Sequence, residues 1–85
     1  MAEATLAIQI ATPERLVLDQ RADYAEIPGK DGYMGILPGH AALLSELGPG
    51  KLTLTLSGKS ESFNVTGGYV EVRDDHVRVL ADHIE

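Results

Sequence analysis

Hydrophobic and polar residues alternate with a period of two along most of the chain. Leu6 and Ile8, for example, stand on either side of Ala7, and the pattern continues to Ile10. Successive side chains of a β-strand point to opposite faces, so each such run has one buried and one solvated face, as is typical of antiparallel sheets. The alternating runs cover residues 6–10, 51–56, 62–65, 70–72 and 77–79.

Short segments rich in glycine, proline and aspartate separate these runs. Glycine permits positive φ and proline presets φ, so such segments predict turns between many short strands. Only residues 41–47 have the potential for a helical turn, and this segment is too short to form a stable helix alone. We therefore expect one all-β domain over residues 1–85, either a β-sandwich or a small barrel. The predicted turns are at 28–32, 38–39, 48–50, 57–60, 67–68 and 73–76.

The expected core consists of large apolar side chains at the inward positions of these runs. Burying one aliphatic side chain contributes roughly 1.5–3 kcal/mol, and together these residues offset most of the entropy lost on ordering the chain. We therefore assign them to the core and give them no functional role. They are Leu6, Ile8, Ile10, Val17, Ile27, Ile36, Leu52, Leu54, Leu56, Phe63, Val65, Val70, Val72, Val77 and Val79.

The composition excludes several classes of function. Thirteen acidic and seven basic side chains give a net charge of -6, so the chain lacks the basic surface that nucleic acids or anionic lipids require. With 44% hydrophobic and 24% charged residues the chain has ordinary globular usage. Cysteine is absent, which excludes disulfides, thiolate zinc sites and a cysteine nucleophile. The first five residues show no secretory signal pattern, so we expect none.

The candidate catalytic and metal-binding motifs have simpler structural explanations. Gly58, Lys59 and Ser60 match the end of a phosphate-binding loop, but Thr53 stands where that loop needs its first glycine. The three histidines, His40 among them, lack the spacing of a metal site. We therefore expect no catalytic residue, no metal and no cofactor.

The segment 32–44 differs from the rest of the chain. It combines two glycines, a Pro-Gly turn, a histidine and several large apolar residues. Apolar side chains such as Tyr33 and Met34 between two glycines at a loop tip indicate a contact surface, although they can also cap one end of a sandwich. The residues alone favour a buried, hydrogen-bonded imidazole for His40.

The sequence resembles the epsilon subunit of the F-type ATP synthase, which is called delta in mitochondria. The resemblance covers essentially the whole chain, and the matching motifs follow in the family's order and spacing. Its most specific part is the run Gly-Tyr-Met-Gly-Ile-Leu-Pro-Gly-His-Ala-Ala-Leu-Leu at 32–44. The other matching motifs are Thr-Pro-Glu at 12–14, Pro-Gly at 28–29 and 49–50, Gly-Gly-Tyr-Val-Glu-Val at 67–72, and the strand 77–82.

This resemblance implies the N-terminal domain of that subunit, a flattened antiparallel β-sandwich of about ten short strands. In the family this domain is not an enzyme. It lies at the foot of the central stalk, binds the gamma subunit and rests on the polar loops of the membrane c-ring, coupling ion flow to ATP synthesis. The resemblance therefore implies a rotor subunit, peripheral on the cytoplasmic face of the bacterial plasma membrane, with no nucleic-acid partner and no insertion into lipid.

Family alignment also implies which residues make the two contacts. The expected c-ring contact comprises Gly32, Tyr33, Met34, Gly35 and His40. The expected gamma contact comprises Leu43, Leu44 and Ser45.

The sequence departs from the family pattern at three places. Many members carry an acidic or polar residue and Leu at the positions of Tyr33 and Met34, and Pro at the position of Ala42. A tyrosine can still pack its ring and hydrogen-bond its hydroxyl at a polar contact, whereas Met34 suits either the core or the contact. Members also usually continue into an inhibitory two-helix hairpin, which we expect to be absent here.

A different class of function is a free-standing β-sandwich that binds a ligand such as a carbohydrate. It would need an exposed aromatic platform, and the chain offers only three tyrosines besides Phe63, which is needed for the core. A small hydrolase that uses His40 or His76 ranks last, because neither a nucleophile nor an orienting partner accompanies the histidine.

Overall fold

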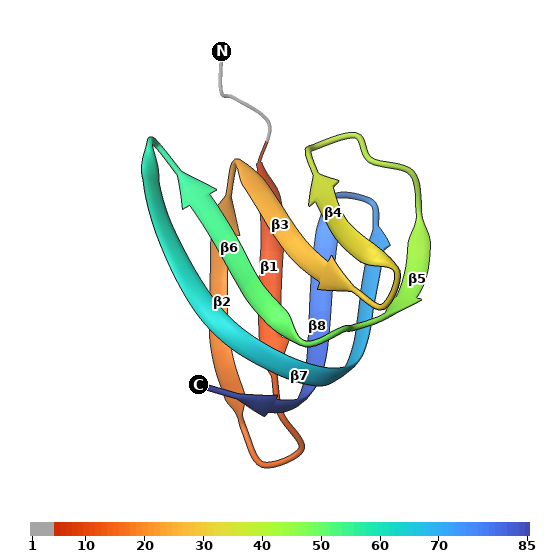
Figure 1. Ribbon diagram of the computed structural model, residues 1–85. Coiled ribbons are helices and arrows are strands. Elements are labelled where there is room, and N and C mark those ends of the chain that lie inside the picture. The colour runs from red at the N-terminus through yellow and green to blue at the C-terminus, as the bar shows by residue number, and fades with distance from the viewer. Residues whose placement is uncertain (1–4) are drawn as a thin grey trace.

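The computed structural model describes residues 5–85, which form eight β-strands and no helix (Figure 1). This confirms the all-β class, with eight strands instead of about ten. Residues 1–4 of the expected domain, and with them most of the segment examined for a secretory signal, lie outside the described residues. The strands are β1 (Leu6–Ala11), β2 (Leu16–Ala22), β3 (Tyr24–Gly29), β4 (Gly32–Ile36), β5 (Leu43–Glu46), β6 (Gly50–Leu56), β7 (Lys59–Arg73) and β8 (His76–Ile84).

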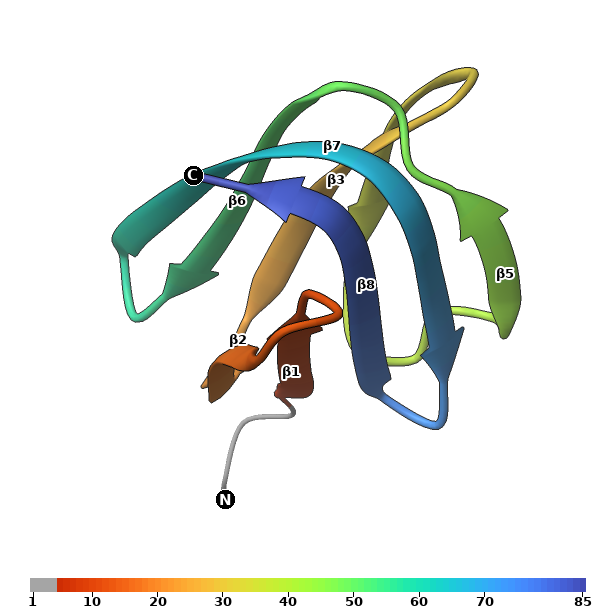
Figure 2. The same ribbon diagram turned by 90° about the horizontal axis from the view of Figure 1, so that it is seen from below.

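The strands form a sheet that curves over into two layers, as Figure 2 shows from below. The strand order is β2-β1-β8-β7-β6-β3-β4, with β5 paired to β7. Neighbours are antiparallel except β1 and β8, which are parallel. The long strand β7 carries the sheet from one layer to the other, because it pairs with β6 along its first half and with β5 near its end.

The predicted turn at residues 67–68 is wrong, because Gly67 and Gly68 lie inside β7. Both have positive φ, 69° and 112°, and the pairing of β7 with β8 continues on either side of them. A Cβ atom at Gly68 would clash with the backbone carbonyl oxygen of Leu80. The two glycines therefore bend one strand instead of separating two, which accounts for part of the smaller strand count.

Residues 41–47, the one stretch with the potential for a helical turn, do not form one, since Leu43–Glu46 forms β5. Its residues alternate between half-buried and exposed, and Leu44 pairs with Glu71 of β7. The inward side of this short strand packs against the core through Leu43. Pairing with an existing strand outweighs the weak helical preference of so short a segment.

The core lies between the layers and contains most of the side chains assigned to it. The exceptions are Val17 and Phe63, which are only partly buried, and Leu56, which is 38% exposed. Leu56 directly precedes the β6–β7 turn, where the layers no longer cover its inward side. The core also contains four residues that the pattern did not assign to it, Ala22, Ala25, Leu47 and Ala81.

Candidate interaction surfaces

The turn between β3 and β4 and the adjoining strand ends, residues 28–35, form a largely exposed tip, here called the β3–β4 tip. Tyr33 on this tip is 57% exposed. The next residue, Met34, is only half-buried, packs against the core and lies beside Gly29. The two positions of the Tyr-Met pair therefore differ, with the tyrosine side chain at the surface and the methionine side chain packed against the core.

Tyr33 is held in place although much of it is exposed. Its Oη accepts a hydrogen bond from the backbone N–H of Lys51 at 3.0 Å. Pairing between β3 and β6 ends at Glu26 and Thr53, shortly before Pro28, which has no N–H to donate. The tyrosine hydroxyl thus satisfies a backbone donor of β6 that the strand ladder leaves unpaired.

Two backbone hydrogen bonds join the β3–β4 tip to the end of β5. The N–H of Lys30 donates to the carbonyl of Glu46 at 3.1 Å, and the N–H of Gly48 donates to the carbonyl of Pro28 at 2.9 Å. The side chains of Lys30 and Glu46 add an exposed ion pair at 3.4 Å. The two segments expected to contact different partners are therefore directly connected.

His40 lies apart from the other residues of the expected c-ring contact. It follows the far end of β4, and the N–H of the preceding Gly39 donates to Oδ1 of Asp75 in the β7–β8 turn at 2.7 Å. The imidazole is half-buried, and its Nδ1 lies 2.7 Å from the carbonyl oxygen of Ala41. A strand of five residues spans about 15 Å, so His40 and Gly32 lie at opposite ends of β4.

In β5 only one of the three residues of the expected gamma contact points outward. Leu44 is 72% exposed, whereas Leu43 packs against the core and Ser45 is half-buried. Because strand residues alternate between faces, Leu43 and Ser45 support the strand from its inner side. Leu44 alone can contact a partner on the outer face.

Leu44 belongs to a group of exposed apolar side chains that the sequence did not reveal. Tyr69 of β7, which is 53% exposed, pairs with Leu80 of β8, which is 52% exposed, and Leu44 on β5 lies diagonally from Tyr69, opposite Glu71. These three residues, here called the apolar band, line a shallow hollow of about 180 Å³. A second hollow of about 220 Å³ extends from Tyr69 and Leu80 to Thr12 and Pro13. Contiguous apolar side chains on an outer face mark an interaction surface.

The outer face of β6 and of the first half of β7 has a different chemistry. Two cross-strand pairs of hydroxyls cover it, Thr53 with Ser62 at 3.1 Å and Thr55 with Ser60 at 3.2 Å. We call this surface the hydroxyl face. Its polar groups bind one another, so it has no contiguous apolar surface to offer a partner.

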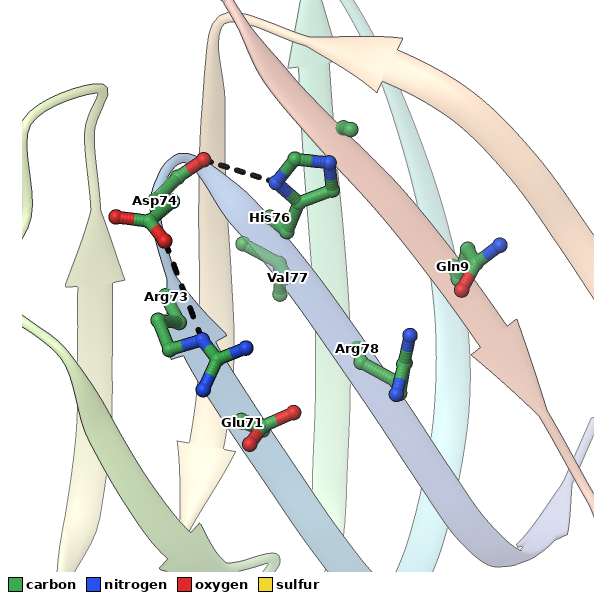
Figure 3. A pocket seen from close by; sticks show the side chains of 8 residues that line it. Gln9, Glu71, Arg73, Asp74, His76, Val77 and Arg78 are labelled. Atoms are coloured by element: carbon green, nitrogen blue, oxygen red, sulfur yellow. Dashed lines mark hydrogen bonds and ion pairs between the residues drawn. The ribbon is translucent and has the colours of Figure 1, made fainter.

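Near the β7–β8 turn, the face that carries the apolar band becomes charged. A hollow of about 270 Å³ lies there, with two arginines and a histidine at its edge (Figure 3). Nδ1 of His76 lies 2.8 Å from the carbonyl oxygen of Asp74, and Nε of Arg73 lies 4.0 Å from the carboxylate of Asp74. Within residues 5–85, no cluster of three or more potential ligands is placed to hold a metal ion. In the same range, no helix is long and apolar enough to cross a membrane.

Residues 5–85 match the model of the family described as the ATP synthase delta/epsilon chain, beta-sandwich domain. This chain belongs to that family. The match extends over nearly the whole sequence, and its description agrees with the layered all-β fold. The free-standing carbohydrate-binding alternative finds no support in this match.

The curated relatives are epsilon chains of bacterial ATP synthases. The epsilon chain of Myxococcus xanthus is 50% identical over 82 residues, which is 96% of this chain and 60% of the relative. The epsilon chain of Solibacter usitatus is 47% identical over 81 residues, 95% of this chain and 60% of the relative. The chain thus spans about three fifths of the length of these relatives.

Solved mitochondrial assemblies contain the same fold. A chain of the Euglena gracilis ATP synthase, solved with its c-ring, superposes with a TM-score of 0.91 at 23% identity and covers 98% of this chain and 54% of its own length. A chain of the Tetrahymena thermophila central stalk and c-ring gives a TM-score of 0.80 at 20% identity, covering 100% of this chain and 69% of its own. At this level of identity the likeness concerns the fold.

Proposed function

We propose that this chain is a non-catalytic rotor subunit of a bacterial F-type ATP synthase, which bridges the gamma subunit and the c-ring and couples ion translocation to ATP synthesis. The observation that carries this proposal is the connection between two exposed surfaces, the β3–β4 tip and the apolar band. Hydrogen bonds from Lys30 to Glu46 and from Gly48 to Pro28 join the tip to β5, which carries Leu44 of the band. A subunit that binds two partners at the same time needs its two binding surfaces to be held in a fixed arrangement.

In this proposal the β3–β4 tip contacts the polar loops of the c-ring. Gly32, Tyr33 and Gly35 present the surface, and Met34 packs against the core. The ring of Tyr33 packs on the loops while its anchored hydroxyl keeps the side chain from swinging away. His40 lies outside this contact because it follows the opposite end of β4.

The gamma subunit covers the apolar band in this proposal. Leu44 makes the contact expected from the family, and Tyr69 and Leu80 extend it across β7 and β8. Large apolar and aromatic side chains at the centre of an interface contribute most of its binding energy. Leu43 and Ser45 act indirectly, since they hold β5 in place from its inner side.

The same proposal determines where the subunit resides. Bound to gamma and the c-ring, it is peripheral on the cytoplasmic face of the bacterial plasma membrane. The net charge of -6 suits contacts with polar, basic loops better than contact with anionic lipid headgroups.

Binding measurements with purified gamma subunit and with detergent-solubilised c-ring from the same ATP synthase test this function. Leu44→Asp is expected to abolish binding to gamma, and Tyr33→Glu is expected to weaken binding to the c-ring. Ser62→Asp on the hydroxyl face adds the same charge and serves as the control that leaves both contacts intact. If the unaltered chain binds neither gamma nor the c-ring, the proposed function is wrong.

A further inference from the structure

The charged hollow near the β7–β8 turn is built on a regular grid of outward side chains from three strands. In one row Ala7 of β1 pairs with His76 of β8, which pairs with Arg73 of β7. These side chains line the hollow together with the charged groups of Glu71, Asp74 and Arg78. Ala7 carries only a methyl group, so a space remains above it between the longer side chains of its neighbours.

The second row of the grid supplies the polar groups that face this space. Gln9 of β1 pairs with Arg78 of β8, and Arg78 pairs with Glu71 of β7. Figure 3 shows the Arg78 guanidinium between the amide of Gln9 and the carboxylate of Glu71. An arginine and a glutamine next to each other offer several N–H donors to one acceptor.

Arg78 differs from the other charged groups of the hollow. Arg73 has the Asp74 carboxylate near it, and His76 has the Asp74 carbonyl. Among residues 5–85, by contrast, no carboxylate lies within ion-pair distance of the Arg78 guanidinium, although Glu71 is its direct cross-strand neighbour. This guanidinium is therefore available for an acceptor from outside the chain.

The hollow is continuous with the apolar band. Arg78 and Glu71 line the charged hollow and also the smaller hollow formed by Leu44, Tyr69 and Leu80. A surface that covers the band therefore also reaches Arg78. Interfaces commonly have an apolar centre and a polar rim, and this face has the same arrangement.

We propose that Arg78 binds an acidic side chain of the gamma subunit, whose carboxylate enters the charged hollow when gamma covers the apolar band. This inference rests on the proposed function. The planar guanidinium matches a carboxylate in two parallel hydrogen bonds, and the Gln9 amide provides a further donor. The carboxylates of Glu71 and Asp74 in the same hollow repel a doubly charged anion such as phosphate more than a singly charged side chain.

The ion pair between Arg78 and the acidic side chain of gamma fixes how the two subunits are aligned with each other. Apolar contacts on the flat outer face of a sheet constrain translation weakly, whereas a bidentate ion pair at one end of the band allows one alignment. Arg78 is thus a specificity-determining residue of the contact, and Leu44, Tyr69 and Leu80 supply most of its affinity.

The test measures the affinity of the full chain for purified gamma from the same ATP synthase over a range of salt concentrations. Arg78→Ala is expected to raise Kd about thirtyfold or more and to flatten its dependence on salt. Arg78→Lys is expected to restore the salt dependence and only part of the affinity. The lysine ammonium keeps the positive charge but cannot form the two parallel hydrogen bonds of a guanidinium. Lys59→Ala, at the start of β7, removes the same charge away from the band and is expected to leave Kd unchanged.

A charge exchange identifies the partner group. Arg78→Glu is expected to abolish binding to unaltered gamma, and one Asp→Arg or Glu→Arg variant of gamma is expected to restore it. The inference is overturned if Arg78→Ala binds as tightly as the unaltered chain while Leu44→Ser still loses binding, and equally if no such gamma variant restores binding. Failure of the unaltered chain to bind gamma at all would instead overturn the proposed function.

Discussion

The two outer faces of the sandwich share strand β7 but differ in chemistry. On the hydroxyl face, Ser60 and Ser62 in the first half of β7 form hydrogen bonds to threonines of β6. On the other face, Tyr69 in the second half of β7 lies exposed next to Leu80 and lines one hollow with it and Leu44. In both regions the strands bury one side against the core and expose the other. Folding alone therefore does not account for the difference between the two outer surfaces.

The difference shows that the apolar band is not required by the fold. The hydroxyl face demonstrates that an outer surface of this sheet can be polar and satisfied within the chain. An exposed leucine such as Leu80 adds little to folding, because its side chain stays largely in water in the isolated chain. A role in binding a partner explains why three such side chains lie together.

The largest expected effect concerns the bend in β7 that separates the two faces. Gly68→Ala places a Cβ atom against the Leu80 carbonyl in a backbone conformation with φ of 112°. We expect the free energy of unfolding to fall by roughly 3 kcal/mol or more, a large share of the stability of a small domain. Chemical denaturation with urea measures this change.

The matched control for the bend is Gly58 in the β6–β7 turn. It also has positive φ, 81°, but nothing lies within 4 Å of a Cβ atom placed there. Gly58→Asn is expected to cost less than about 1 kcal/mol, because asparagine tolerates this region. If Gly68→Ala and Gly58→Asn lower the free energy of unfolding equally, β7 accepts a side chain at its bend and the prediction is wrong.

The second prediction sets the two faces against each other directly. Tyr69→Glu is expected to raise Kd for gamma about a hundredfold, because it buries a charge in the apolar centre of the contact. Ser62→Glu places the same side chain on the same strand but on the hydroxyl face, and Kd is expected to stay within about twofold. Calorimetric titration measures both affinities, and similar losses for the two variants would contradict the distinction between the faces.

The third prediction concerns the tyrosine of the β3–β4 tip. Tyr33→Phe removes the acceptor for the Lys51 N–H and is expected to lower the free energy of unfolding by about 1 kcal/mol. Amide hydrogen exchange at Lys51 is expected to accelerate, while exchange in the middle of β8 changes only with global stability. Unchanged protection of the Lys51 amide would mean that this hydrogen bond does not hold the tip.

The smallest expected effect lies within the hydroxyl face. A double-mutant cycle with Thr53→Val and Ser62→Ala is expected to give a coupling energy of about 0.5 kcal/mol between these cross-strand neighbours. Neither change is expected to alter Kd for gamma. A measurable loss of affinity in either single variant would extend the proposed interface onto this face.

Much of the fold follows from the alternating pattern, because a strand buries every second side chain. The alternating pattern gives a wrong prediction where the same local sequence is compatible with two different structures. Gly67 and Gly68 look like a turn, but the pairing of Thr66 with His83 beyond them shows that the strand continues. Leu56 has an inward position, yet its place at the end of a hairpin leaves it uncovered.

The candidate site was only partly predictable for a similar reason. Leu44 and the β3–β4 tip follow from motifs within one continuous segment of sequence. Tyr69 and Leu80 belong to different strands, and each alone is an ordinary exposed apolar residue. Only the register that pairs Tyr69 with Leu80, together with the position of β5, reveals them as one surface. Arg78 likewise gains its significance from Gln9 and Glu71 on neighbouring strands.

The parallel pairing of β1 with β8 has a consequence for how the protein is made. Ile8 lies opposite Val77, and Ile10 lies opposite Val79, so the pairing of β1 is complete only when β8 is in place. During synthesis on the ribosome, the β1–β2 hairpin emerges early and has no parallel partner for β1 until β8 leaves the exit tunnel. Such distant pairing slows folding. The nascent chain is therefore most exposed to misassembly before β8 is released.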